Sequence, residues 1–224
     1  MVDNPNRKKR SYSNMTKTDA EARLGFRIGE LIEHAVPAAK MLSKIADENA
    51  VKETKEKVYR NIVDYIEVEG YPSESRSDFK EANISDLVYA TMIPIISDFK
   101  RQTRCALRFQ REDKEIVSVD SETGDTEAFV LMDFVSVAKD KFVFVVEAKR
   151  SSVGEAMKQL LLAMKDARDI NNGGTVYGFT TTGDIWQMVS YNGEAFEVTE
   201  QFFALFPRMH EEKERWLKDF SILV

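Results

Sequence analysis

Apolar residues in the first part of the chain recur with the 3.6-residue period of amphipathic helices. One stripe follows Thr18 and Glu21, which form a capping box, and another ends at Gly70. The stretch before them is polar and basic. The pattern therefore predicts a flexible basic arm over residues 1–17 and a helical N-terminal region over residues 18–74.

A longer amphipathic stripe, with Ser77 as its candidate N-cap, extends to Phe99. Beyond it the period changes from 3.6 to 2, because Leu107 and Phe109 alternate with basic and polar residues such as Arg108. This change predicts a helix followed by a strand that has one apolar face and one basic face.

The rest of the chain alternates strands with helices. Two of its segments are apolar on both faces, which is typical of strands in the middle of a covered sheet. They span residues 129–137 and 142–148, and are followed by a capped helix at 153–170, short strands at 175–181, 185–191 and 195–199, and a last helix near 207–220. We therefore expect an α/β domain over residues 75–224, with a mixed central sheet flanked by helices.

Composition and charge restrict the classes of function. A formal net charge of −6 argues against a general nucleic-acid coat protein, so a polyanionic partner would have to meet a local basic patch or a bound metal. The apolar runs are far shorter than the roughly 20 residues that a membrane span needs, and no membrane partner is expected. The single cysteine, Cys105, and the lack of a signal-peptide pattern favour an intracellular location, cytoplasmic or nuclear. The basic cluster Arg7–Arg10 is either a nuclear address or a solvated tail.

Two carboxylates within the apolar segments are the strongest candidates for chemistry. Asp133 lies inside the first segment, and Glu147 lies near the end of the second, with Lys149 on the same face two residues later. An ionised carboxylate in such surroundings is costly unless something compensates it. If the hairpin turn centres on Asp140, then Asp133 pairs directly with Glu147, and the acidic pocket that results would suit Mg²⁺ or Mn²⁺.

A metal held in this way favours phosphodiester hydrolysis. The metal activates a water molecule, while Lys149 orients or helps to deprotonate that water and offsets charge on the phosphate. A basic strand face that includes Arg104 and Arg108 is the candidate contact for the phosphates of a nucleic-acid substrate. The alternative for the same residues is a buried ion pair between Lys149 and one of the two acids.

The order helix, three strands, helix, strand resembles the PD-(D/E)xK nuclease superfamily, which has a restriction-endonuclease-like αβββαβ core. The resemblance covers about residues 77–191, with Asp133 in the second strand and Glu147-Ala148-Lys149 at the end of the third. It implies a metal-dependent nuclease in which Asp133, Glu147 and the Ala148 carbonyl bind Mg²⁺ or Mn²⁺. In this chain Met132 replaces the proline of the motif.

The resemblance also implies contributions from two helices. Many members of the superfamily add an acid from the first helix, for which Glu81 is the first choice and Asp86 the second. Some add a glutamine after the lysine, and Gln159 is in that position. The tyrosine that often follows this glutamine by one turn is replaced by Ala163.

Three alternatives remain open from the sequence. The first is a catalytically inactive nuclease-fold module that binds nucleic acid or, through the N-terminal helices, a protein partner. The second is a relative of the viral cap-snatching endonucleases, in which an upstream histidine, here His34, also binds metal. The third is a structural or regulatory α/β protein whose acids form salt bridges.

Overall fold

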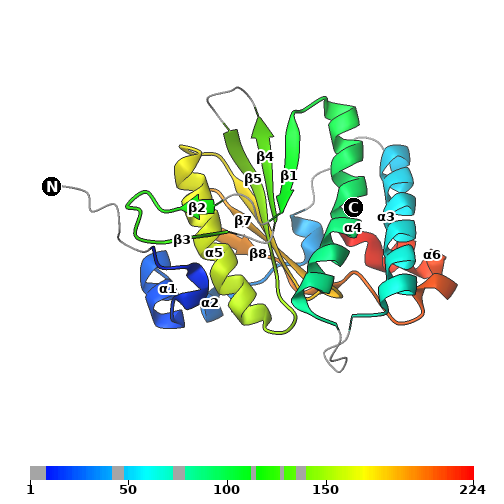
Figure 1. Ribbon diagram of the computed structural model, residues 1–224, viewed down its shortest axis with the longest axis horizontal. Helices are drawn as coiled ribbons and strands as arrows, with labels where there is room; N and C mark the ends of the chain where they lie inside the picture. Colours follow the sequence, from blue (N-terminus) through cyan, green and yellow to red (C-terminus); the bar gives the residue numbers. More distant parts are fainter. Residues whose placement is uncertain (1–8, 42–47, 73–78, 112–114, 127–128, 135–139) are drawn as a thin grey trace.

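A mixed β-sheet with helices on both faces organises the computed structural model (Figure 1). The structure describes residues 9–41, 48–72, 79–111, 115–126, 129–134 and 140–224. The strands are β1 (Leu107–Arg111), β2 (Glu115–Val117), β3 (Gly124–Thr126), β4 (Phe129–Phe134), β5 (Asp140–Ala148), β6 (Val176–Thr181), β7 (Ile185–Tyr191), β8 (Phe196–Val198) and β9 (Phe202–Phe203). The α-helices are α1 (Lys17–Leu24), α2 (Ile28–Glu33), α3 (Glu48–Glu69), α4 (Glu81–Thr103), α5 (Val153–Ile170) and α6 (Lys213–Arg215).

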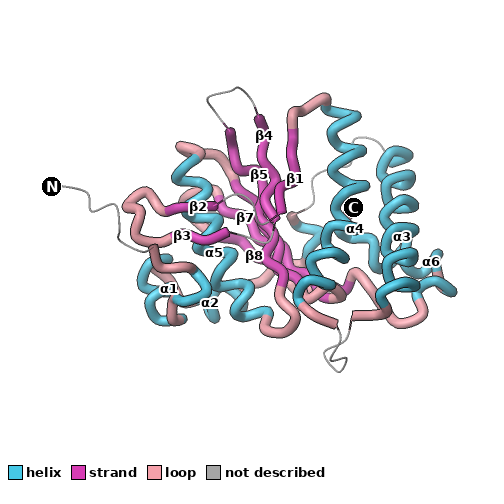
Figure 2. The backbone as a smooth tube through the Cα atoms, in the orientation of Figure 1, coloured by secondary structure: helices cyan, strands magenta, loops and turns pink. Residues whose placement is uncertain are grey.

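The strand order of the main sheet is β1-β4-β5-β6-β7-β8, and β9 pairs with β7. Neighbouring strands are antiparallel except β5 and β6, which are parallel and are joined by α5. A parallel pair needs such a crossover because the chain must return to the starting edge of the sheet. β2 and β3 form a separate hairpin inserted between β1 and β4, and it lies beside α5 (Figure 2).

Each face of the sheet is covered by one layer of helices. On one face α5 packs with α1 and α2, and the buried core there includes Leu160, Met164 and Val145 (the α5 layer). On the other face α4 packs with α3 and the C-terminal segment, around Leu87, Val146 and Trp186 (the α4 layer). The expected α/β architecture with a mixed, helix-covered sheet is confirmed.

The two long helices next to the sheet begin at local capping contacts. α5 starts at the predicted position, where the Ser152 hydroxyl accepts a hydrogen bond from the Glu155 backbone N–H at 3.3 Å. α4 starts at Glu81, and the Asn83 side chain accepts from the Lys80 backbone N–H at 2.8 Å. The predicted cap Ser77 lies outside the described residues. Pro94 is accommodated inside α4 as the sequence indicated.

Several element boundaries differ from those expected. The first stripe is capped by Thr16 rather than Thr18, and Gly25, with φ of 85°, divides it into α1 and α2. The β2–β3 hairpin, which includes Gly124, has no counterpart among the expected elements. The single C-terminal helix expected over 207–220 is instead three short helical pieces, at Met209–Glu211, Lys213–Arg215 and Trp216–Phe220.

The part of the expected basic arm that the structure describes is anchored to the α5 layer. Tyr12 is fully buried, and its hydroxyl donates to Asp166 Oδ2 at 2.7 Å. Burial raises the pKa of Asp166, although the bonds from Tyr12 and Arg23 oppose the increase. The expectation of a flexible arm is therefore wrong for these residues, because Tyr12 and Met15 contribute apolar surface to the core.

Candidate functional site

The register of the β4–β5 hairpin separates the two predicted metal ligands. Asp133 pairs with Lys141 of β5 and Leu107 of β1, not with Glu147. Lys141 and Glu147 are six residues apart along β5, which corresponds to about 20 Å. One cation with ligands at about 2.0–2.6 Å cannot bridge that distance, so the expected Asp133–Glu147 pocket is wrong.

The two carboxylates also belong to opposite faces of the sheet. Asp133 alternates with Phe129 and Leu131, whose side chains pack in the α4 layer. Glu147 alternates with Val145, which packs in the α5 layer. A single pocket on one face of the sheet therefore cannot contain both.

Apolar pairing on both faces explains the observed register. Phe129 is opposite Val146, and Leu131 is opposite Phe144. On the other face Val130 and Met132 are opposite Val145 and Phe142. The expected register would have moved these apolar partners out of alignment. The summed stabilisation from the buried apolar pairs outweighs whatever stabilisation one carboxylate would gain from a different pairing. The hairpin consequently closes between Phe134 and Asp140 instead of centring on Asp140.

A different set of charges converges at the carboxyl end of β5. Lys149 Nζ lies 2.7 Å from Glu147 Oε1 and 3.3 Å from Glu81 Oε1. The two carboxylate oxygens are thus within about 6 Å of each other. The Glu147 side chain is 4% exposed, whereas Glu81 is 54% exposed, so the cluster is open to solvent on the Glu81 side. We call Glu81, Glu147 and Lys149 the acid–lysine cluster.

Each member of the acid–lysine cluster comes from the end of a regular element. Glu147 is the penultimate residue of β5. The Lys149 backbone N–H donates a hydrogen bond to the Thr181 carbonyl oxygen at 3.0 Å, which holds Lys149 at the end of β6. Glu81 is the first residue of α4, where a carboxylate is favoured by the helix dipole. Asp86, the second choice for this role, instead forms an exposed ion pair with Arg111 at 2.6 Å.

Lys149 is held as an ammonium ion. Burial alone would lower its pKa, but the charges of Glu147 and Glu81 and their hydrogen bonds outweigh burial, so the pKa of Lys149 is raised. A lysine with a raised pKa cannot take a proton from water near neutral pH. In this arrangement its chemical contribution is a positive charge and a set of hydrogen-bond donors.

Two further predicted site residues are Ala148, which lies between Glu147 and Lys149 in the sequence, and Gln159, which is on α5. Ala148 ends β5, and its side chain is buried in the α4 layer. Gln159 is buried on α5. His34 is the C-cap residue of α2, and its Nδ1 lies 2.7 Å from the Glu30 carbonyl oxygen.

The structure adds polar residues that the sequence did not single out. Thr180 of β6 is opposite Glu147, and Gln187 of β7 is opposite Thr180. Thr180 Oγ1 and Gln187 Oε1 are buried without a hydrogen-bond partner in the described part of the chain. Only the β5–β6–β7 register reveals this row, because the three residues come from separate segments of the sequence.

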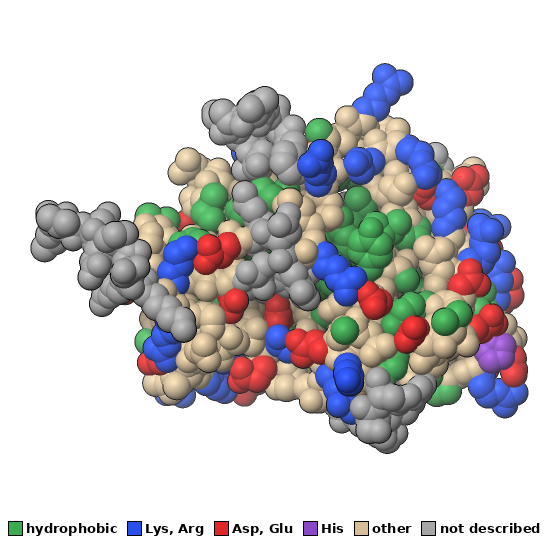
Figure 3. Space-filling view, in the orientation of Figure 1, with side chains coloured by type: hydrophobic (Ala, Val, Ile, Leu, Met, Phe, Trp, Pro, Cys, Tyr) green, Lys and Arg blue, Asp and Glu red, His purple; other side chains and the backbone are tan. Residues whose placement is uncertain are grey.

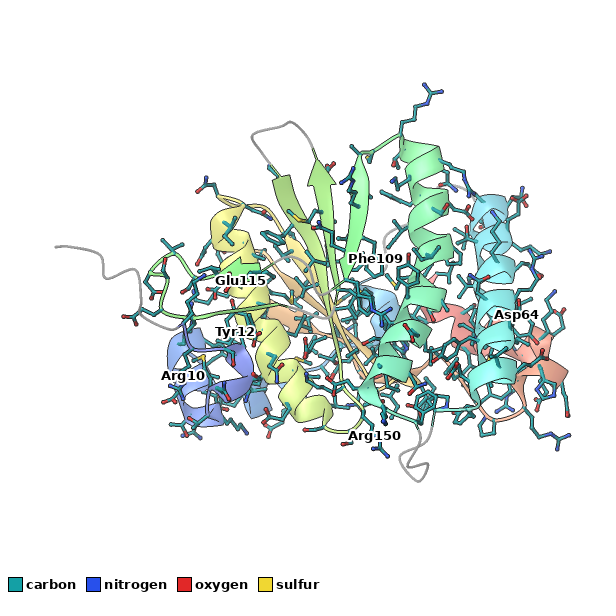
Figure 4. The ribbon with its side chains drawn as sticks, in the orientation of Figure 1. Arg10, Tyr12, Asp64, Phe109, Glu115 and Arg150 are labelled. Atoms are coloured by element: carbon teal, nitrogen blue, oxygen red, sulfur yellow. The ribbon has the colours of Figure 1, made fainter. Side chains whose placement is uncertain are left out.

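The basic residues predicted to contact phosphate have different environments. Arg104 is exposed at the C-cap of α4, with φ of 57°. Arg108 lines a hollow of about 890 Å³ between α4 and β1, together with Ile93, Ile96, Lys100, Arg101 and Phe109 (Figure 3). We call this hollow the α4–β1 groove. Phe109, which lines the groove, lies between the sheet and α4 in Figure 4, and Arg150 lies at the lower end of the sheet.

The donor set of the acid–lysine cluster matches the demands of a small hard cation only in part. Two carboxylates, with water or substrate phosphate as the remaining ligands, are a known minimal set for Mg²⁺. Within the described ranges no group of three or more His, Cys, Asp or Glu side chains is placed to hold a metal.

Comparison with family models, with curated proteins and with solved structures found no match. Among the helices that the structure describes, none is both long and apolar enough to cross a membrane. The fold thus defines the class as an α/β protein with a mixed, helix-covered sheet, and the function has to be argued from the site.

Proposed function

We propose that this chain is a metal-dependent nuclease whose centre is the acid–lysine cluster. The observation that carries the proposal is the contact of one lysine, Lys149, with two carboxylates, Glu147 and Glu81, at the end of a central strand. Two carboxylates and a lysine at one point are the groups that metal-assisted phosphodiester hydrolysis needs. Asp133 has no part in this centre.

The order of elements around the cluster supports the finer fold assignment. α4, β1, β4, β5, α5 and β6 follow one another as helix, three strands, helix, strand, and the four strands are adjacent in the order β1-β4-β5-β6. This is the order that the PD-(D/E)xK resemblance implies. Glu147-Ala148-Lys149 ends the third of these strands, and Glu81 lies on the first helix, as the resemblance also implies.

Each residue of the cluster has a distinct task in the proposed reaction. Glu147 and Glu81 would hold Mg²⁺ or Mn²⁺, and the ion would supply Lewis-acid activation of water and charge neutralisation at the phosphate. Lys149, which stays protonated, orients the attacking water and stabilises negative charge on the phosphate oxygens as it develops. Gln159, buried on α5, would orient water from the α5 side.

A cleavage assay with matched lysine variants tests this proposal. The full-length protein, Lys149→Ala and Lys141→Ala would be incubated with single-stranded and duplex DNA and RNA in Mn²⁺ or Mg²⁺, with EDTA as the blank. Both lysines are on or next to β5, but Lys141 is at the opposite end of the strand. We expect Lys141→Ala to cleave like the wild type and Lys149→Ala to be inactive. Equal loss in both variants, or no cleavage by the wild type, would reject the proposal.

A catalytically inactive nuclease-fold module is the second candidate function. It is favoured by the position of Asp133, which leaves the centre one carboxylate short of the set that the resemblance implies. Calorimetric titration of the wild type with Mn²⁺ separates the two candidates. Heat that disappears in Glu147→Gln supports the nuclease, whereas the absence of any binding heat supports the module.

The proposed substrate is nucleic acid, which would bind in the α4–β1 groove. The proposed location of the protein is intracellular. Of the basic cluster Arg7–Arg10, for which the sequence allows either a nuclear address or a solvated tail, Lys9 and Arg10 are within the described residues. They form ion pairs with Glu115 and Asp19, at 3.1 and 2.7 Å. Both contacts tie the cluster to the α5 layer.

A further inference from the structure

The α4–β1 groove is a basic surface on a chain whose formal net charge is −6. Lys100 and Arg101 from α4 and Arg108 and Arg111 from β1 line it. Two aspartates of α4 form ion pairs with the arginines: Asp98 Oδ1 lies 2.5 Å from Arg101 Nη1, and Asp86 Oδ1 lies 2.6 Å from Arg111 Nη1. Lys100 has no ion-pair partner among the residues that the structure describes, so its ammonium is available to an anionic ligand.

One face of α4 forms a continuous wall beside this groove. Tyr89, Ile93, Ile96 and Lys100 are spaced three or four residues apart, which places them on the same side of the helix. The eleven residues from the tyrosine to the lysine correspond to about 16 Å of helix. An aromatic group and a cation thus stand at opposite ends of one apolar strip. Figure 3 shows a hollow with apolar side chains and with basic side chains above it.

A ladder of nearly parallel aromatic rings ends at this surface. Phe129 stacks on Phe109, with ring centroids 5.0 Å apart and an interplanar angle of 7°. Phe109 stacks in turn on Tyr89, at 6.2 Å and 21°. Tyr89 is 44% exposed, so a further flat group can continue the stack beside it.

The groove also contains an amide whose oxygen has no partner. Gln110 lines the groove, and its Oε1 is buried without a hydrogen bond to any described residue. An amide offers both donors and an acceptor, which is the pattern needed to bind the edge of a base.

We propose that the α4–β1 groove binds a single-stranded segment of nucleic acid, with bases stacked on Tyr89 and phosphates at Lys100 and Arg108. This inference rests on the proposed nuclease function and names the substrate class of that function. Basic side chains alone would accept duplex and single strand alike. A stacking surface can contact the faces of bases only when the bases are unpaired, which selects the single strand.

Equilibrium binding in EDTA tests the groove without any hydrolysis. Fluorescence anisotropy would compare labelled oligothymidylate, oligouridylate and a duplex of the same length, using the full-length protein at two salt concentrations. Tyr89→Leu is matched by Tyr177→Leu, because Tyr177 on β6 is 42% exposed and lies outside the groove. Arg108→Glu, combined with Lys100→Glu, is matched by Arg27→Glu on the α5 side of the sheet.

We expect the single strand to bind more tightly than the duplex, and Tyr89→Leu to weaken single-strand binding about tenfold. The double charge reversal should weaken binding more strongly and flatten its dependence on salt, whereas Tyr177→Leu and Arg27→Glu should bind like the wild type. Equal effects of the groove and control variants, or tighter binding of duplex, would overturn the inference. Groove-dependent binding without cleavage would reject only the proposed nuclease, and cleavage that is indifferent to the groove variants would reject only the groove.

Discussion

The two ends of the β4–β5 hairpin each carry an acid and a lysine, but only one end has the features of a reactive site. At one end half-buried Asp133 is opposite exposed Lys141. At the other end Glu147 is almost fully buried, and its lysine, Lys149, also contacts a second carboxylate from α4. The difference teaches that an acid and a lysine in apolar strands indicate chemistry only when a separate element brings a further charge to the same point.

The two ends also differ in the way their charges are compensated. An exposed pair of charges is solvated by water and contributes little to stability. A carboxylate that is 4% exposed depends on its partners, because desolvation of an unpaired charge is costly. The following predictions test this contrast in order of decreasing effect.

The largest expected contrast is between the two carboxylates in the cleavage assay. Glu147→Gln should reduce Mn²⁺-dependent cleavage by about 100-fold to 1000-fold, because it removes a charge at the proposed centre. Asp133→Asn, about 20 Å away along the sheet, should leave the rate unchanged. Initial rates at saturating Mn²⁺ would measure both. Loss of activity in Asp133→Asn alone would restore the original Asp133 assignment.

The next contrast is the stability of the two lysine variants. Lys149→Met should lower the free energy of unfolding by about 2–3 kcal/mol at neutral pH, because Glu147 is left buried without its main partner. Lys141→Met should lower it by less than about 1 kcal/mol, since Lys141 is exposed. Urea unfolding of the metal-free proteins, followed by circular dichroism, measures both values.

A double variant gives the control for this stability contrast. Glu147→Gln combined with Lys149→Met should recover about 1–2 kcal/mol relative to Lys149→Met alone, because the unpaired charge is gone. If the double variant does not recover stability, the cost arises from packing of the lysine stem rather than from charge.

The smallest expected effect concerns an ion pair that joins α3 to the far end of α4. Burial raises the pKa of Asp98, but hydrogen bonds from Lys57 and Thr54 and the charge of Arg101 outweigh it, so the pKa lies below its ordinary value of 3.8. Asp98→Asn should therefore cost about 1–2 kcal/mol at neutral pH.

The sign of the pH dependence follows from the lowered pKa of Asp98. Its contribution to stability is fully present above the ordinary pKa of 3.8 and is lost as the pH falls through the folded-state pKa. The difference in unfolding free energy between wild type and Asp98→Asn should accordingly shrink in acid, as measured by urea titrations over a pH series. A difference that stays constant in acid would show that Asp98 acts by hydrogen bonding alone.

Local patterns in the sequence were sufficient to predict much of the fold. The capping box at Ser152 and the apolar stripe after it located α5 at its observed boundaries. The period of 2 located β6 and β7 within one residue. These patterns were less informative for the insertion between β1 and β4, where the short β2–β3 hairpin was not expected.

The sequence by itself singled out the Glu147-Ala148-Lys149 triplet, and an acid on the helix before the strands, as candidate residues. Only the tertiary structure decided that Glu81, and not Asp133, joins that triplet. The physical reason is that helix and strand periods are set by neighbours in the chain, whereas strand register is set by apolar pairs on both faces of the sheet. Those pairs come from distant segments, so their sum becomes known only when the sheet is assembled.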